Sequence, residues 1–170
     1  MKRLLIICLL LLAGCAITDS SKAPVFDKNA KWALLPMENH TETPQAALHM
    51  EAITETLFRV KGAMSLETYP PSLSQDSLFE PADDKAVEAA FVWAQQSGAR
   101  YAITGTVNEW RYKTGVDGEP AVGITIKIID VQTRQVIWSA AGGRTGWGRE
   151  AVSAVAQKLL ENLIDGIKLK

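Results

Sequence analysis

Three β-rich runs follow one another between residues 99 and 141, and they constrain the fold more than any other feature of the chain. They read ARYAITGTVNEWRYK, AVGITIKIIDV and RQVIWSAA. The middle run alternates as a half-buried strand does, with Thr125 and Lys127 on one side and Val122, Ile124, Ile126 and Ile128 on the other. Asp117-Gly118 predicts a turn between the first two runs, and DVQTRQV predicts a hairpin between the last two. The second half of the chain is therefore committed to a β-sheet.

Apolar residues at helical spacing predict three helices around these strands. Thr43 is in position to cap the first helix, and Gly98 is placed to end the second. The third helix is expected over residues 149–163, as the last element of the chain. The predicted buried faces of the first and third helices are Ala47, Met50, Ile53, Leu57 and Val60, and Val152, Val155, Leu159, Leu163 and Ile167, respectively.

Two further strand-like runs, KWALLPM and MSLETY, give the expected order β-α-β-α-β-β-β-α. Elements in this order pack as a mixed β-sheet with helices against it. We expect a single-domain α/β sandwich over residues 31–170, because a chain of this length suits one core.

The N-terminus has the pattern of a bacterial lipoprotein signal. A short basic segment precedes the apolar run LLIICLLLL, which is too short to cross a bilayer comfortably, and LAGC follows it. We expect residues 1–14 to be a signal peptide, Cys15 to carry acyl chains such as palmitate, and residues 15–30 to hold this cysteine and a flexible tether. Ala16, rather than Asp, favours the periplasmic face of the outer membrane. An ordinary signal peptide or a membrane helix is the alternative.

The charge of the chain argues against some partners. The formal net charge is −1, and loss of Lys2 and Arg3 with the signal peptide would lower it to −3. A near-neutral protein is not expected to bind nucleic acid. Cys15 would be the only remaining cysteine, so no disulfide is expected.

We expect neither enzyme activity nor a cofactor or metal site. The sequence contains no GxSxG and no HExxH motif. Glu38, His40 and Glu42 alternate, so a strand could place them together as metal ligands. Because they follow Pro36, a loop of solvated polar side chains is the favoured interpretation.

The stretch GGRTGWGRE, at residues 142–150, has the strand–glycine loop–helix layout of a phosphate site. It lacks the lysine of a P-loop and the glycine order of a dinucleotide fold, so tight turns or close packing explain its glycines better. Trp147 lies in this stretch with Arg144 and Arg149 nearby. Two interpretations stay open: an indole at the headgroup level of a membrane beside these arginines, or an indole folded back as a lid over the core.

The combination of LAGC, the run from ARYAITGTV to IIDVQTRQVIWSA, and GRTGWGRE resembles the PelC family, the outer-membrane lipoproteins of Pel exopolysaccharide secretion systems. EWRYKTGVDGEPAVG is the most specific part of this resemblance. The YAITGTV run and the IIDVQTRQVIWS hairpin are also similar to the wider CsgG/LpoB-like group of lipoproteins, which shares an α/β sandwich.

The resemblance implies a homo-oligomeric ring of twelve subunits, which guides a cationic polysaccharide of biofilms to a PelB-like β-barrel exporter without catalysis. Cys15 matches the acylated cysteine. Asp117 matches an acid that faces the opening of the ring, and Glu119 adds to it. Trp147 matches an aromatic residue that meets the membrane on the opposite rim. One carboxylate per subunit, repeated around a ring, gives a concentrated negative field that attracts a polycation and weakens with salt.

Two other lipoprotein functions stay open. An LpoB-like monomer that activates a peptidoglycan synthase usually has a longer tether than the one expected here, whose roughly 15 residues span about 50 Å when extended. A CsgG-like pore would need membrane hairpins of about ten residues per strand. The short tether favours work close to the membrane, so the ring is the preferred hypothesis.

Overall fold

The computed structural model describes residues 16–70, 84–115, 118–148 and 150–170. The expected elements are present as β3 (Trp32–Leu34), α2 (Ala46–Lys61), β5 (Leu66–Thr68), α3 (Asp84–Gln96), β6 (Tyr101–Tyr112), β7 (Pro120–Asp130), β8 (Val136–Thr145) and α4 (Val152–Ile164). Four short strands were not predicted: β1 (Ala16–Ser20), β2 (Val25–Phe26), β4 (Glu38–Asn39) and β9 (Lys168–Leu169). The α/β sandwich predicted from the sequence is confirmed.

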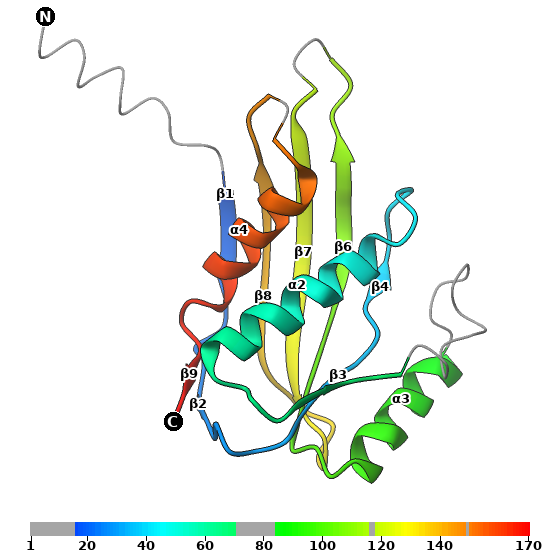
Figure 1. The fold of residues 1–170 in the computed structure, drawn as a ribbon, viewed down its shortest axis with the longest axis vertical. Helices are drawn as coiled ribbons and strands as arrows, with labels where there is room; N and C mark the ends of the chain where they lie inside the picture. Colours follow the sequence, from blue (N-terminus) through cyan, green and yellow to red (C-terminus); the bar gives the residue numbers. More distant parts are fainter. Residues whose placement is uncertain (1–15, 71–83, 116–117, 149) are drawn as a thin grey trace, which may run out of the picture.

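One mixed sheet holds most of these strands, in the order β1-β8-β7-β6-β3-β5, with β4 beside β6 (Figure 1). β6, β7, β8 and β1 pair antiparallel, whereas β3 is parallel to both β5 and β6. The two predicted hairpins, β6–β7 and β7–β8, are therefore present.

Helices α2 and α4 lie across one face of β6, β7 and β8, which we call the front face (Figure 1). The residues predicted to line the buried side of β7 and of α4 are all buried there, which confirms both patterns. The α2 pattern is partly wrong. Val60 is 79% exposed, whereas Thr54 and Phe58 are fully buried. The Thr54 hydroxyl donates to the Met50 carbonyl at 2.8 Å, so a polar side chain is satisfied within this core.

Thr43 does not cap α2. The helix begins two residues later than the cap requires, after Gln45, which has a positive φ of 60° and makes no capping bond through its side chain. The Thr43 hydroxyl instead donates to the backbone oxygen of Trp110 in β6. Gly98 does end α3 in the left-handed conformation, with a φ of 77°, as predicted.

Residues 16–30 are not a free tether. β1 pairs with β8 along the sheet edge, and β2 pairs with β9. Phe26 is 1% exposed, and its ring centroid lies 5.4 Å from that of Trp32 and 5.3 Å from that of Tyr101. Burial of such a ring stabilises the fold by roughly 2–3 kcal/mol, which anchors a segment of otherwise polar composition.

None of the helices in the described part of the chain is long and apolar enough to span a bilayer.

Candidate functional site

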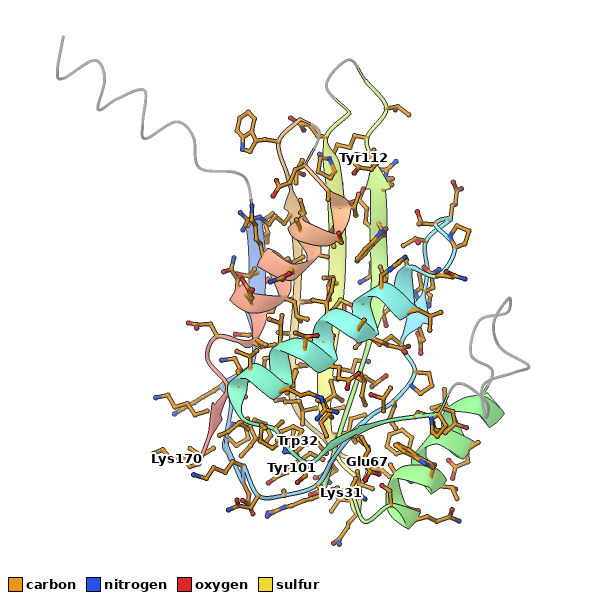
Figure 2. The ribbon with its side chains drawn as sticks, in the orientation of Figure 1. Lys31, Trp32, Glu67, Tyr101, Tyr112 and Lys170 are labelled. Atoms are coloured by element: carbon orange, nitrogen blue, oxygen red, sulfur yellow. The ribbon has the colours of Figure 1, made fainter. Side chains whose placement is uncertain are left out.

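The candidate site lies at one end of the sheet, where β6 ends, β7 begins, β8 ends and β1 begins (Figure 1). We call this the anchor end. Tyr112 marks it, and the aromatic residues Trp32 and Tyr101 lie toward the other end of the molecule (Figure 2). Of the residues singled out in the sequence, the anchor end contains Glu119, Arg144 and Trp147, whereas Cys15, Asp117 and Arg149 lie outside the described residues.

The glycine-rich stretch at residues 142–150 is only partly a loop, because its first residues continue a strand. Gly142 and Gly143 belong to β8, and the connection to α4 starts only after Thr145. A Cβ atom on Gly146 would lie 2.5 Å from Cγ2 of Val155 and 2.8 Å from Cγ of Pro120. Gly146 therefore lets the connection lie close to both α4 and the start of β7, and Gly148, with a φ of 49°, makes the turn. These roles account for two of the glycines without a phosphate ligand.

Trp147 projects from this connection with 58% of its surface exposed. The indole therefore does not cover the core of the chain, which argues against the lid interpretation.

Glu150 braces the turn that carries Trp147. Its carboxylate accepts a bond from Lys158 Nζ at 2.5 Å and a long bond from the Trp147 backbone N–H at 3.5 Å. The hydrogen bond from Lys158 is the main reason that the pKa of Glu150 is lowered. The Tyr112 hydroxyl also donates to the Glu150 carbonyl oxygen at 3.2 Å, which ties the turn to the end of β6.

Arg144 connects this turn to the start of β1. It lies in β8 directly opposite Ala16, the first residue of β1. Ala16, the residue that follows the predicted lipid attachment site in the sequence, therefore lies at the same end of the subunit as the exposed Trp147.

Glu119 also lies at the anchor end. Its carbonyl accepts a bond from the Lys113 backbone N–H at 2.7 Å across the β6–β7 hairpin, and Pro120, the next residue, accepts a bond from the Gly146 N–H at 2.8 Å. Glu119 and Trp147 are thus on neighbouring connections. This arrangement differs from the opposite rims that the family resemblance implied.

The candidate metal ligands are only partly brought together. Glu38 lies in β4 rather than in a loop, and His40 Nε2 lies 3.2 Å from its carboxylate. Among the described residues, no three side chains of metal-binding type gather at one point.

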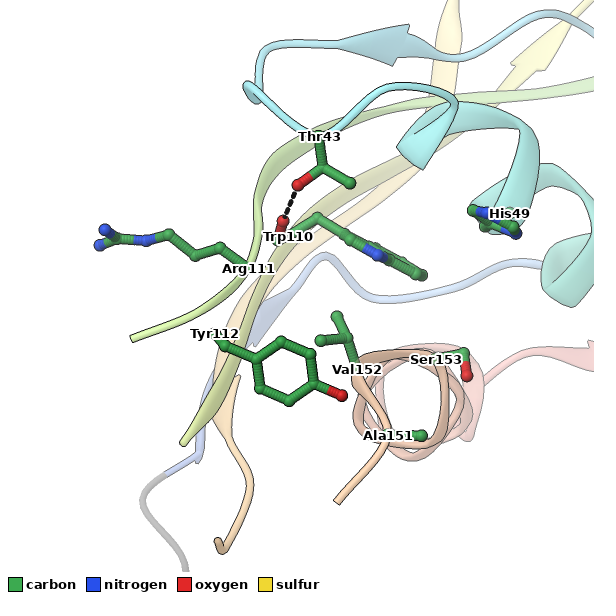
Figure 3. A pocket seen from close by; sticks show the side chains of 8 residues that line it. All are labelled: Thr43, His49, Trp110, Arg111, Tyr112, Ala151, Val152 and Ser153. Carbon is green, nitrogen blue, oxygen red and sulfur yellow. Dashed lines mark hydrogen bonds between the residues drawn. The ribbon is translucent and has the colours of Figure 1, made fainter. Parts of the chain in front are cut away.

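An open cleft of about 450 Å³ lies between the starts of α2 and α4 and the end of β6 (Figure 3). Its walls include Trp110, Tyr112, Val152 and His49, whose ring stacks on Trp110 with centroids 6.1 Å apart. Figure 3 shows the Arg111 guanidinium pointing away from it. Sequence reasoning missed the cleft because its walls come from three elements that are distant in the chain.

Two solved structures are similar to this chain over nearly its whole length. No family model and no curated protein matches the chain. Among solved structures, a PelC from Paraburkholderia phytofirmans, solved as a dodecamer in space group P6, is 35% identical with a TM-score of 0.78. The match covers 92% of this chain and 99% of that one. This chain belongs to the PelC family. A Leu-to-Met variant of that PelC, a dodecamer in space group C2, is 36% identical over 92% of this chain and 100% of that one, also with a TM-score of 0.78.

More distant structures share the fold of this PelC family member. Lipoprotein GNA1162 from Neisseria meningitidis is 18% identical with a TM-score of 0.60, covering 80% of this chain and 96% of that one. The LpoB C-terminal domain from Salmonella enterica is 17% identical with a TM-score of 0.51, covering 71% and 86%. The predicted relation to the wider lipoprotein group thus holds at the level of fold.

Proposed function

We propose that this chain is a lipid-anchored subunit of a homo-oligomeric ring at the periplasmic face of the outer membrane, which serves the secretion of a Pel-like exopolysaccharide. The observation that carries this proposal is the near-complete match to a PelC that is a dodecamer in two different space groups. A dodecamer that recurs in two space groups, once in a variant with a single substitution, is a property of that protein rather than of one crystal.

The mass of the lipidated protein, extracted in detergent, tests the ring directly. We expect a particle of about twelve subunits by light scattering or native mass spectrometry. The same measurement on Cys15→Ser separates the contribution of the lipid from that of the protein interface. A lipidated protein that stays monomeric at micromolar concentration would contradict the ring and favour the LpoB-like alternative.

In this proposal the anchor end faces the bilayer. Three features support that orientation: Cys15 directly precedes β1, Arg144 lies opposite Ala16, and Trp147 is exposed beside them. An exposed indole near arginine suits the headgroup region, because the ring is amphipathic and the guanidinium meets phosphate. Arg149, next to this turn in the sequence, would add a second cation.

The acidic residues Asp117 and Glu119 would then line the membrane-proximal mouth of the ring. Glu119 lies on the connection next to that of Trp147, which supports this position. Repeated in every subunit, these carboxylates would draw a cationic polymer toward the mouth and pass it to a β-barrel exporter of the PelB type. No bond is made or broken in this function.

The structure weakens the LpoB-like alternative. That function needs a tether that reaches away from the membrane, whereas this chain is paired in a sheet from Ala16 onward. An anchored subunit would therefore stay against the bilayer.

A further inference from the structure

Four lysines gather at the end of the molecule opposite the anchor end, which we call the distal end. They form what we call the lysine cluster: Lys28, Lys61, Lys168 and Lys170. The pairing of β2 with β9 brings three of them together. Val25 of β2 pairs with Lys168. The backbone N–H of Lys28 donates to the Lys170 carbonyl at 2.9 Å. The fourth, Lys61 at the end of α2, places its Nζ 3.4 Å from the Ile167 carbonyl oxygen, directly before β9.

Contacts with the core determine which way these side chains point. Leu169 packs against the core, and its partner in the pairing, Phe26, is buried. The Lys170 backbone N–H donates to the Phe26 carbonyl at 3.0 Å, so the extended backbone continues past β9. Because side chains alternate along such a backbone, Lys168 and Lys170 point away from the core on either side of Leu169. The backbone under the cluster is thus held in place while the ammonium groups reach solvent.

Positive charge is in excess in the lysine cluster. In the part of the chain that the structure describes, none of the four lysines forms an ion pair, whereas Lys31 and Lys158 each pair with a glutamate. Of the two acids in the same segments, Asp27 already pairs with Arg100 at 3.8 Å. Asp165 therefore stands against four lysines, and the excess persists even if Lys170 carries a terminal carboxylate. Such a cluster attracts a polyanion.

The position of the cluster argues against two other partners. Phe26 contacts Tyr101, and β6 runs from Tyr101 at the distal end to Tyr112 at the anchor end (Figure 2). At about 3.3 Å per residue, the two ends of β6 are roughly 35 Å apart. Salt screens charges over about 8 Å, so a bilayer at the anchor end would not act on the cluster. A cationic exopolysaccharide would be repelled by it.

We propose that the lysine cluster binds the carboxylate-rich peptidoglycan layer beneath the outer membrane. This inference rests on the proposed function, in which the anchor end faces the bilayer and the distal end therefore faces the peptidoglycan. Ammonium groups on flexible stems suit this partner, because such a polymer offers its carboxylates without one fixed geometry. A single lysine contributes little, but a ring repeats the cluster in every subunit, and the contacts act together.

Co-sedimentation with purified peptidoglycan sacculi tests the proposal. We expect the detergent-solubilised lipidated ring to sediment with sacculi at low salt and to stay in the supernatant at high salt, because salt screens exposed charges. Amidation of the sacculus carboxyl groups should abolish the binding at low salt. A wild-type ring that does not sediment with sacculi, or that sediments equally with amidated sacculi, would overturn the inference while leaving the proposed function standing.

Variants of the cluster identify the binding surface. Lys28→Gln, Lys168→Gln and Lys170→Gln are changes at exposed side chains, so together they should leave the melting temperature unchanged. They should raise the Kd for sacculi at least about tenfold, because every subunit of the ring loses three contacts. A matched control removes the same charge at exposed positions elsewhere and should bind as the wild type does: Lys113→Gln, Lys127→Gln and Lys158→Gln.

The remaining outcomes separate this partner from others. An equal loss of binding in both triple variants would show an unspecific effect of charge and overturn the assignment to the cluster. A ring that loses mass when the cluster is changed would show that the lysines meet another subunit instead. Binding of Cys15→Ser to anionic lipid vesicles through the same lysines, as strongly as to sacculi, would show a lipid surface as the partner and also overturn the inference. A monomeric wild type would instead overturn the proposed function.

Discussion

At the scale of single residues, Glu51 is the side chain with the most unusual surroundings. It lies on α2, and its carboxylate accepts a bond from the Met37 backbone N–H at 2.8 Å. Burial raises the pKa of Glu51 to about 7, and the bond from Met37 opposes only part of that rise. Near neutral pH the side chain therefore exchanges a proton while fixing the segment between β3 and β4 onto the helix.

The stability of the protein should depend on pH through Glu51. Because its pKa in the folded state is raised above the ordinary value of 4.5, its stabilising contribution is complete below pH 4.5 and is lost as the pH rises through about 7. Glu51→Gln keeps an acceptor for Met37 and has no proton to lose. We expect this variant to be more stable than the wild type at pH 8 by roughly 1–3 kcal/mol and equal to it near pH 4.5.

Urea unfolding of both proteins at several pH values measures this difference. Glu55→Gln, a change at a more exposed carboxylate on the same helix, serves as the control. Parallel pH profiles for the wild type and Glu51→Gln would show that Glu51 does not titrate in this range.

Trp147 provides a second prediction for a single residue. Since the indole is exposed, Trp147→Ala should change the free energy of unfolding by no more than about 0.5 kcal/mol. It should weaken the association of the assembled protein with liposomes, because the indole would be lost from the headgroup region. Flotation of the ring with vesicles measures this effect. Val136→Ala, at a residue of similar exposure near the other end of β8, is the control, and equal flotation of both variants would exclude a membrane role for Trp147.

At the scale of elements, Gly146 controls how β8 turns into α4. Gly146→Ala places a methyl group against Val155 and Pro120, and these neighbours belong to packed elements that resist movement. We expect a loss of stability of roughly 1–3 kcal/mol, measured by thermal unfolding. Gly166→Ala, where an added Cβ meets nothing within 4 Å, should have little effect. If the two variants unfold alike, the turn is more adaptable than its contacts indicate.

The same elements show how far the sequence predicts this fold. β7 and α4 are predictable because their burial follows a strict period, from Val122 to Ile128 and from Val152 to Ile167. β1 and β2 were missed because such short strands have no buried period of their own; Phe26 is the only residue of 16–30 that is fully buried. The α2 pattern failed at Val60, where an apolar residue faces outward.

The site was less accessible to sequence reasoning than the elements. Trp147 and Arg144 stand out in a glycine-rich stretch, but their position beside Glu119 depends on the pairing of β8 with β7 and on the Gly146–Pro120 hydrogen bond. Such contacts join residues that are distant in the chain, and periodicity carries no information about them.

At the scale of the whole molecule, the proposed ring would determine the electrostatic field at its mouth. A single subunit carries only a small net charge, whereas a ring repeats each carboxylate around one mouth. We expect Asp117→Lys to leave the subunit folded and the ring assembled, and to reduce polymer export in cells. Export measured with a lectin or antibody against the polymer reports the effect.

A charge reversal elsewhere on the ring supplies the control for this prediction. Glu161→Lys, on the outer side of α4, makes the same change of charge away from the anchor end and should leave export unchanged. Equal export by the wild type and Asp117→Lys would remove that carboxylate from the proposed guidance of the polymer.

Because β1 is paired with β8 from Ala16 onward, the proposed ring would hold its lipid anchors rigidly at the membrane. If Cys15 carries acyl chains, these are attached directly before the first strand of the subunit, without a flexible linker. Lipids on flexible linkers would insert and detach independently. Lipids on a rigid ring stay close to the bilayer while the others remain inserted, so a detached lipid reinserts rapidly. The attachment becomes multivalent, so the residence time on the membrane rises steeply with the number of subunits, and completed rings are retained where single subunits are still free to exchange.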